Sequence, residues 1–461
     1  MAISISEKYL QDADKKVFDP EHRRKLNFNI SQYDKKVADG KKQFTDLELA
    51  KERASFLKAK VVDNLDKYLI EFESNFIKRG GKVIWARDAK EAQEEIIKIL
   101  KRFDTKTVVK SKSMVTEEIH INDALEKEGI ESLETDLGEF IVQLRKEAPY
   151  HIVTPAMHLS KEDVAKTFHE EKGTPEKFTP QQITAYVRKF LRDKYVAAEA
   201  GITGGNFLIA DIGAVALTEN EGNAWLSMAF PKVHIAIVGI EKIVPSISDM
   251  ELFWSLLATH GTGQNVTVYN SIVTGPRQNG EVDGPEEMYV VLLDNGRSNV
   301  LEQVEQRRAL QCIRCGACLN ACPIYKGVGG HAYGTTYSGP IGSVITPHMR
   351  GMKEFKHLSY SSSLCGKCAE VCPVKIDLPN LLLYNRRDSV KEKFSSTAEN
   401  LMWVFWKKAM MKRSTMEKGG AKLKNFMLNQ FFKKQWGHRR DLPKVAPKSF
   451  NQSWKESRGL K

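Results

Sequence analysis

A chain of 461 residues, of which 41% are hydrophobic and 28% are charged, has a globular composition and is long enough for two or three domains. Its most apolar stretches, near 207–217 and 233–244, are interrupted by glycines and acidic residues. They are therefore expected to be buried strands rather than membrane spans. The amino terminus lacks the apolar core of a signal peptide, so we expect a cytoplasmic protein. The net charge of +12 is concentrated in residues 401–461, which carry 16 Lys and Arg against three Asp and Glu, so the rest of the chain is near −1. This distribution argues against a basic nucleic-acid-binding surface on the main domains.

The first 300 residues combine a helical extension with an alternating α/β pattern. Residues 1–60 are charged and helical in pattern, and residues 61–78 place Leu65, Tyr68 and Phe72 on one side of an amphipathic helix. Strands are then expected at 82–86, 107–110, 131–135 and 287–293, and helices at 88–101, at 117–127 and from 137, with further β segments between 204 and 244. This alternation predicts an α/β domain with a largely parallel sheet over residues 61–298.

The rest of the chain divides into a cysteine-rich region and a basic tail. All seven cysteines lie within residues 299–390, which we expect to form an iron–sulfur domain, and the segment 327–342 is rich in Gly and small polar residues, so we expect a loop. The helical, basic C-terminal region 391–461 holds four of the seven Trp residues. Its apolar and basic stretches at 401–411 and 423–435 fit three roles: docking to a partner subunit, lying on an anionic membrane surface, or packing on its own protein.

The first cysteine motif is a complete ferredoxin run. Cys312, Cys315, Cys318 and Cys322 followed by Pro323 give the spacing C-x2-C-x2-C-x3-C-P. Three thiolates two residues apart wrap around one cluster, and the fourth points toward a second cluster. The run holds too many close thiolates for one tetrahedral zinc ion.

The second motif lacks its first cysteine. Cys365, Cys368 and Cys372 precede Pro373, but Ser362 stands where the first Cys is expected. In the crossed pattern of ferredoxins, Cys312, Cys315, Cys318 and Cys372 hold the first cluster, and Cys322, Cys365 and Cys368 hold the second. The second cluster is then a 3Fe-4S cluster or a 4Fe-4S cluster with a non-cysteine fourth ligand. Ser362 is the candidate oxygen ligand, although a hydroxyl is a poor partner for soft iron–sulfur chemistry.

Other polar segments are less informative. The acidic run 134–139 is explained by a strand end and a helix start, and 110–113 fits an anion site or a solvated loop equally well. Asp211 and Glu221 suggest a pocket at strand ends or ordinary turns, and neither His151 nor His158 has metal-ligand spacing. The sequence has no dinucleotide or phosphate-binding fingerprint, so the catalytic residues stay unknown.

Several longer segments carry a family resemblance. The stretches KSKSMVTEEI (110–119), ETDLGEFIVQL (134–144), HIVTPAMH (151–158) and ADIGAVALTENEGN (210–223), together with GGHAYGTTYSGPIG (329–342), resemble the iron–sulfur, B-type branch of the LUD-domain lactate-utilization family. The resemblance implies a CoA-transferase-like α/β LUD domain and a ferredoxin-like dicluster domain. It also implies that the seven cysteines are cluster ligands.

The same resemblance implies a function in a complex. The expected role is an electron-transfer subunit, not necessarily catalytic itself, in the oxidation of L-lactate to pyruvate, with a cysteine-rich-domain (LutA-like) protein and a second LUD (LutC-like) protein as partners. The electron acceptor stays unnamed, nucleic acid is not expected as a partner, and any membrane contact is peripheral. Two alternatives stay open: an iron–sulfur subunit that serves another 2-hydroxy acid such as glycolate, and a zinc-stabilised nucleic-acid-binding module.

Overall fold

The computed structural model describes residues 3–416, 418–437 and 440–459. The chain divides into two compact units, Met1–Ser389 and Val390–Lys461, and each is described by itself.

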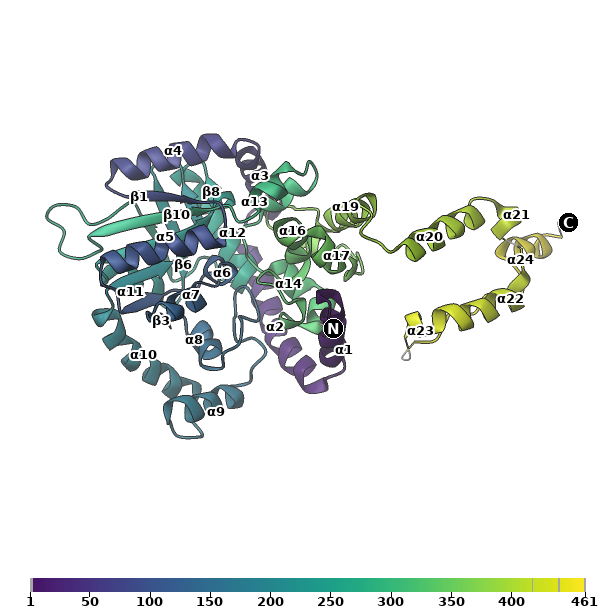
Figure 1. Cartoon of the computed structure of the whole chain (residues 1–461), viewed down its shortest axis with the longest axis horizontal. Helices are drawn as coiled ribbons and strands as arrows, with labels where there is room; N and C mark the ends of the chain where they lie inside the picture. Colours follow the sequence, from purple (N-terminus) through teal and green to yellow (C-terminus); the bar gives the residue numbers. More distant parts are fainter. Residues whose placement is uncertain (1–2, 417, 438–439, 460–461) are drawn as a thin grey trace. The chain divides into compact units, whose positions relative to one another are not determined.

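A six-stranded parallel sheet forms the centre of the first unit (Figure 1). Its strands are, in spatial order, β1 (Lys82–Ala86), β10 (Glu287–Leu293), β7 (Val233–Gly239), β4 (Ala200–Thr203), β2 (Thr107–Lys110) and β3 (Glu131–Glu134). Because all of them run in one direction, their carboxyl ends meet along one edge. The predicted α/β architecture with a mostly parallel sheet is therefore confirmed.

Alternating residues of the central strands pack on opposite faces of this sheet. In β10, Tyr289, Val291 and Leu293 join one core with helices α5 (Ala89–Arg102) and α7 (Ile121–Lys127). Met288, Val290 and Leu292 join another core, which contains helix α4 (Leu65–Lys78) and a small sheet. A strand buried on both faces is apolar throughout, which explains the unbroken apolar run of β10. The small sheet has the order β8 (Ile243–Val244), β5 (Phe207–Ile209), β6 (Ala214–Glu219) and β9 (Tyr269–Val273).

The helices around the sheets begin at polar caps. Asp88 caps α5 by accepting the amide of Glu91, and Asp136 caps α8 by accepting the amide of Glu139. The helices of this region are α4 (Leu65–Lys78), α5 (Ala89–Arg102), α6 (Met114–Glu118), α7 (Ile121–Lys127), α8 (Leu137–Leu144), α9 (Lys161–Lys172), α10 (Pro180–Ala197), α11 (Asn223–Ala229), α12 (Met250–Thr262) and α13 (Arg297–Glu302).

Three expected elements differ from the structure. The helix expected over 61–78 is two helices, because the chain turns at Asp63 and Asn64 between α3 (Leu47–Val62) and α4. The helix expected over 117–127 is interrupted at His120, whose backbone is left-handed with φ of 49°. The expected loop 327–342 is wrong at both ends. Its first two residues still belong to α15 (Pro323–Val328), and Gly339 already opens α16 (Gly339–Arg350), where the fixed φ of Pro340 suits a first helical turn.

The N-terminal helices α1 (Ile5–Val17), α2 (Pro20–Gly40) and α3 pack against the cysteine-rich region. Tyr9 of α1 is buried and lies 5.9 Å from Tyr333, ring centre to ring centre. The cysteine-rich region itself consists of short helices: α14 (Ala317–Ala321), α15 (Pro323–Val328), α16 (Gly339–Arg350), α17 (Met352–Tyr360), α18 (Lys367–Glu370) and α19 (Leu378–Lys391). One apolar core joins these helices with α2, α3 and α12, so the N-terminal extension forms part of the body that holds the cysteines.

The second unit is helical, and many of its apolar side chains are exposed to solvent. Trp403, Phe405 and Trp406 of α20 (Thr397–Met410) are all more than half exposed. The other elements are α21 (Arg413–Met416), α22 (Gly420–Met427), a π-helical turn (Leu428–Phe432), α23 (Lys433–Trp436) and α24 (Phe450–Ser457). Within the described residues, no helix is both long and apolar enough to cross a membrane.

Candidate metal centres

The first cysteine loop is a tight turn that leads into α14. Arg314 and Gly316 both have left-handed backbones, with φ of 61° and 78°. The amide of Arg314 donates to Cys312 Sγ at 3.3 Å. A Cβ on Gly316 would lie 3.1 Å from Val153 and 3.2 Å from His151, so glycine suits both the backbone and the close packing. This turn places the first three cysteines around one space.

The second cysteine loop repeats this geometry. Leu364 and Gly366 have φ of 55° and 83°, and the loop leads into α18 as the first leads into α14. The amide of Leu364 donates to Ser362 Oγ at 3.2 Å. Helices α14 and α18 pack against each other. The two loops are therefore two copies of one unit, packed side by side.

The packing brings one cysteine of the second motif to the first. Four cysteines line one cavity: Cys312, Cys315, Cys318 and Cys372. Cys372 also accepts the amide of Ile376 at 3.4 Å, a contact that fixes its sulfur. This is the set predicted for the first cluster.

The electrostatics of these thiols suit a cationic metal core. Burial and the neighbouring cysteines raise the pKa values of Cys315 and Cys318, and burial raises the pKa of Cys372 to about 11. Buried thiols that repel one another's negative charge ionise readily only when a cation is shared among them. Four cysteine sulfurs around one cavity therefore fit a 4Fe-4S cluster better than an apolar core.

The remaining three cysteines form a second group nearer the surface. Burial raises the pKa of Cys368 to about 12, with Cys322 and Cys365 as nearby negative groups, so the three sulfurs are neighbours. Cys365 is exposed and Ser362 is half-buried. The second centre is thus open to solvent on one side, whereas Cys315 and Cys372 of the first are each only 7% exposed.

A buried charge network that no sequence motif predicts lies beside the first centre. The guanidinium of Arg297 pairs with Glu241 at 2.6 Å and Glu118 at 2.8 Å, and Arg314 pairs with Glu241 at 3.3 Å. Arg314 also lies over the ring of Tyr337, 4.4 Å from its centre. The cations hold the pKa of the buried Glu241 carboxyl down, at about 2. These residues come from segments far apart in the sequence, and the network ties the first cysteine loop to the sheet domain.

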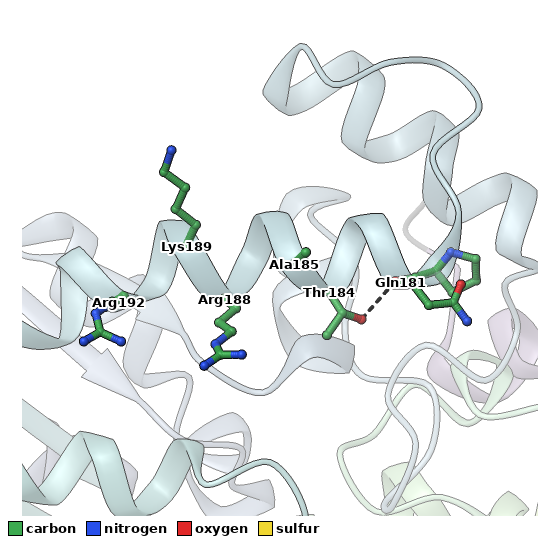
Figure 2. Close-up of a pocket in the computed structure, with 7 residues that line it drawn as sticks. Gln181, Thr184, Ala185, Arg188, Lys189 and Arg192 are labelled. Carbon is green, nitrogen blue, oxygen red and sulfur yellow. Dashed lines mark hydrogen bonds between the residues drawn. The ribbon is translucent and has the colours of Figure 1, made fainter.

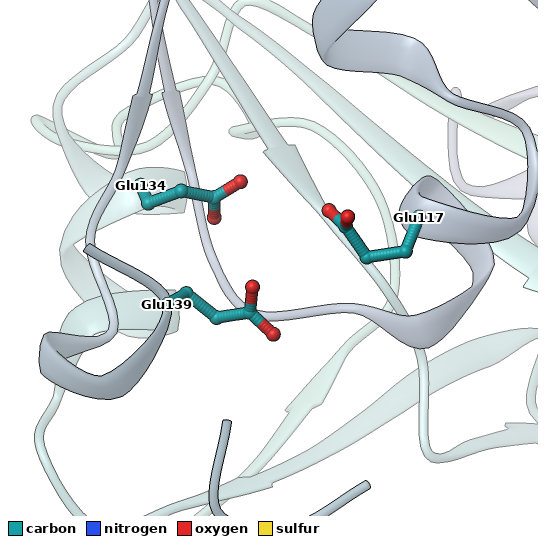
Figure 3. Close-up of side chains that lie close together, drawn as sticks. All are labelled: Glu117, Glu134 and Glu139. Atoms are coloured by element: carbon teal, nitrogen blue, oxygen red, sulfur yellow. The ribbon is translucent and has the colours of Figure 1, made fainter. Parts of the chain in front are cut away.

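Three glutamates also converge within the sheet domain. Figure 3 shows the carboxyl groups of Glu117, Glu134 and Glu139 pointing toward one another. The ammonium of the fully buried Lys110 pairs with Glu134 at 2.6 Å and Glu117 at 3.3 Å, and burial raises the pKa of Glu139 well above its usual value. The ammonium of Lys110 therefore offsets part of this charge, and burial disfavours the charged form of Glu139, so the three carboxyl groups do not by themselves indicate a cation site. Of the two alternatives for residues 110–113, an anion site or a solvated loop, the anion site could not use Lys110, because its ammonium pairs with Glu134 and Glu117.

A hollow on the outer face of α10 is lined by one helix alone (Figure 2). Arg188, Lys189 and Arg192 project from this helix without converging on a common point, and Thr184 donates to the carbonyl of Pro180 at 2.9 Å. Polar groups in a binding site converge, so this hollow has the character of a solvated helix face.

Four other side chains were candidates from the sequence: Asp211, Glu221, His151 and His158. Contacts within the fold or burial explain all of them except Glu221. Asp211 accepts the amide of Ile247, and His158 pairs with Glu147 at 2.8 Å. His151 is buried, and burial lowers its pKa to about 3. Glu221 does line a cavity at the strand ends.

Comparison with known proteins agrees with this architecture. Residues 69–293 match the LUD domain family, and residues 308–376 match the 4Fe-4S dicluster domain family. Lactate utilization protein B of Bacillus velezensis is 48% identical over 340 residues, covering 74% of this chain and 71% of that protein. The protein of the same name from Bacillus subtilis is 49% identical over 72% of this chain and 69% of its own length. An Escherichia coli K12 protein described as an uncharacterized electron transport protein, YkgF, is 41% identical over 88% of this chain and 87% of its own length.

Proposed function

We propose a function for this chain, which belongs to the lactate utilization protein B family. It is the iron–sulfur electron-transfer subunit of a complex that oxidises L-lactate to pyruvate. The names of the relatives support lactate as the substrate, and the E. coli relative's description supports electron transport.

One observation carries the electron-transfer role. Cys312, Cys315, Cys318 and Cys372 line a common buried cavity, although Cys372 belongs to the other sequence motif. A structural zinc site has no need for this crossing, whereas two neighbouring clusters in a ferredoxin-like module depend on it. The matched 4Fe-4S dicluster domain supports the same assignment.

The residues present suit two clusters of different exposure. The buried set would hold a 4Fe-4S cluster, and Cys322, Cys365 and Cys368 would hold the second, with Ser362 Oγ at its fourth corner. Iron–sulfur clusters carry one electron at a time, so the two-electron oxidation of a hydroxy acid needs a further group or a partner site. The exposed Cys365 makes the second centre the natural exit toward a partner.

The proposed partners are a cysteine-rich-domain (LutA-like) protein and a second LUD (LutC-like) protein. Exposed apolar side chains beside basic ones, as in α20, are typical of a segment that docks on another surface. We assign the tail to partner docking.

The test is anaerobic iron and sulfide analysis with EPR, before and after dithionite reduction. Two 4Fe-4S clusters give about eight iron per chain and no EPR signal until reduction. In the complex with both partners, L-lactate should reduce the clusters and glycolate should not. Zinc without iron would refute electron transfer, and reduction by glycolate but not by lactate would refute the substrate.

A further inference from the structure

A cavity of about 410 Å³ lies where the carboxyl ends of the parallel strands meet the first cysteine loop. Ser111 and Lys112 follow β2, Asn206 follows β4, and Lys242 ends the short turn after β7. The fourth wall comes from the cysteine loop itself. In α/β proteins, ligands bind outside the carboxyl ends of parallel strands, and the volume falls in the range of small-molecule sites.

The basic side chains that line this cavity have N–H groups without a hydrogen-bond acceptor among the described residues. Arg314 is only 9% exposed, yet its Nε and Nη1 have no hydrogen-bond partner in the described part of the chain. Lys242 is 7% exposed, and its ammonium makes no hydrogen bond among the described residues. Burial and the nearby Arg314 lower its pKa to about 7, so its positive charge is partial near neutral pH until an anion lies beside it. Buried cations are normally paired, so donors left open toward a cavity point to an anionic ligand.

Two acidic side chains on the same lining have backbone amides as partners. Glu219 accepts the amides of Ala224 and Trp225, and Glu221 accepts the amide of Leu137. Burial and the nearby Asp136 raise the pKa of Glu221 to about 7, so its negative charge is partly lost near neutral pH. The lining thus offers the charged Arg314 and the partly charged Lys242 at one wall, and a carboxyl that can exchange a proton at another.

The cavity also adjoins the first metal centre. Arg314 and Cys315 line both this cavity and the one formed by the four cysteines. A ligand here would therefore lie beside a cluster ligand.

We propose that this cavity binds the carboxylate of a short 2-hydroxy or 2-oxo acid, with Lys242 and Arg314 as its anion contacts beside the first centre. The nature of the acid rests on the proposed function, whereas the site rests on the cavity and its open donors. The volume also accommodates acids longer than lactate. The geometry therefore indicates the carboxylate, and the 2-hydroxy or 2-oxo character of the acid comes from the proposed function.

The test is calorimetric binding of sodium pyruvate to the full-length, iron-loaded protein under anaerobic conditions. Pyruvate is used because it cannot donate electrons as lactate would. Lys242→Met keeps the side-chain length and removes the charge, and it should weaken pyruvate binding by about tenfold or more. If that variant fails to fold, Lys112→Met serves instead, because Lys112 also lines the cavity and is only half-buried. It should weaken binding roughly threefold or more.

Lys58→Met is the matched control. Lys58 is also a fully buried lysine close to Glu241, but its ammonium donates to the carbonyls of Glu241 and Ile243 and does not line the cavity. Its loss should change pyruvate binding by less than about twofold. An equal loss in the Lys58 and Lys242 variants would show a general charge effect and overturn the site.

Three further outcomes test the site, the class of acid and the proposed function separately. Iron-loaded protein with normal EPR spectra and no pyruvate binding would refute the site and leave electron transfer intact. Phosphate binding as tight as pyruvate would refute the organic-acid class. Zinc in place of iron refutes the proposed function, and pyruvate binding measured on that same sample then decides the site independently.

Discussion

Ser362 and Cys312 occupy equivalent positions in the two cysteine loops. The hydroxyl of Ser362 accepts the amide two residues on at 3.2 Å, just as the sulfur of Cys312 does at 3.3 Å. The residue that donates has a left-handed backbone in both loops. The second loop therefore keeps the ligand geometry of the first and differs in one atom, oxygen for sulfur.

This equivalence predicts a labile iron in the second cluster. Oxygen is a weaker ligand than thiolate for iron–sulfur chemistry, so mild ferricyanide oxidation should release about one iron per chain from the native protein and produce a 3Fe EPR signal. Ser362→Cys should prevent this loss, because the thiolate takes the same place.

Ser362→Ala is the control for the previous prediction. It removes the oxygen and should lose the iron more readily than the native protein. Equal iron loss in all three proteins would show that residue 362 does not face the cluster.

The crossed arrangement predicts which cysteine serves which centre. Cys372→Ala should abolish the EPR signal of the buried first cluster even though Cys372 lies in the second motif, since it shares a cavity with Cys312, Cys315 and Cys318. Cys365→Ala should instead affect the exposed cluster. Spin quantitation after reduction distinguishes them. Loss of the same signal in both variants would contradict the crossing.

Much of the fold follows from local sequence pattern. The bounds of β1, β2 and β10 agree with the expected ranges, because each is a short run of apolar residues between turn-forming or charged segments. The breaks at Asn64 and His120 were missed because both flanking stretches keep a helical pattern and only the backbone of single residues changes. The LUD and dicluster domains were correctly identified from their motifs.

The site was only partly accessible from sequence. Cysteine spacing is local and has few chemical meanings, so it located both candidate centres. The cavity proposed for the acid is lined by Lys112, Lys242 and Arg314, which lie in three separate loops or turns and share no motif. Only the sheet order, which brings the ends of β2 and β7 to one edge, places them together.

Arg297 should be essential to stability. It pairs with two carboxylates, Glu118 and Glu241, and is 1% exposed. Removing one partner of a buried ion network leaves uncompensated charge, so Arg297→Met should lower the free energy of unfolding by about 3–5 kcal/mol in urea denaturation. Arg277→Ala, which breaks a surface pair with Glu286, should cost at most about 1 kcal/mol. Similar losses in the two variants would contradict a structural role for the network.

His234 should make the protein less stable in mild acid. Burial lowers its pKa in the folded chain to about 3, whereas an unfolded histidine titrates near 6.5. The unfolded state therefore binds the extra proton as pH falls below 6.5, and between pH 7.5 and 5.5 this removes about 1.4 kcal/mol of stability. His234→Gln cannot titrate and can still hydrogen-bond Thr203, which contacts His234 at 2.8 Å. Its urea midpoint should fall less over this range than that of the native protein, and parallel pH profiles would show that His234 ionises freely when folded.

The tail should be dispensable for the metal centres and required for assembly. The division of the chain after Ser389 separates every cysteine from the exposed aromatic side chains of α20. A chain ending at residue 389 should therefore keep its iron content and EPR spectra. Co-purification with the two proposed partners should drop by about tenfold or more, because the apolar contacts would be lost. Trp403→Ala with Trp406→Ala in the full chain tests those contacts without truncation. Retained co-purification in both proteins, with lost binding to anionic phospholipid vesicles, would assign the tail to a membrane surface instead.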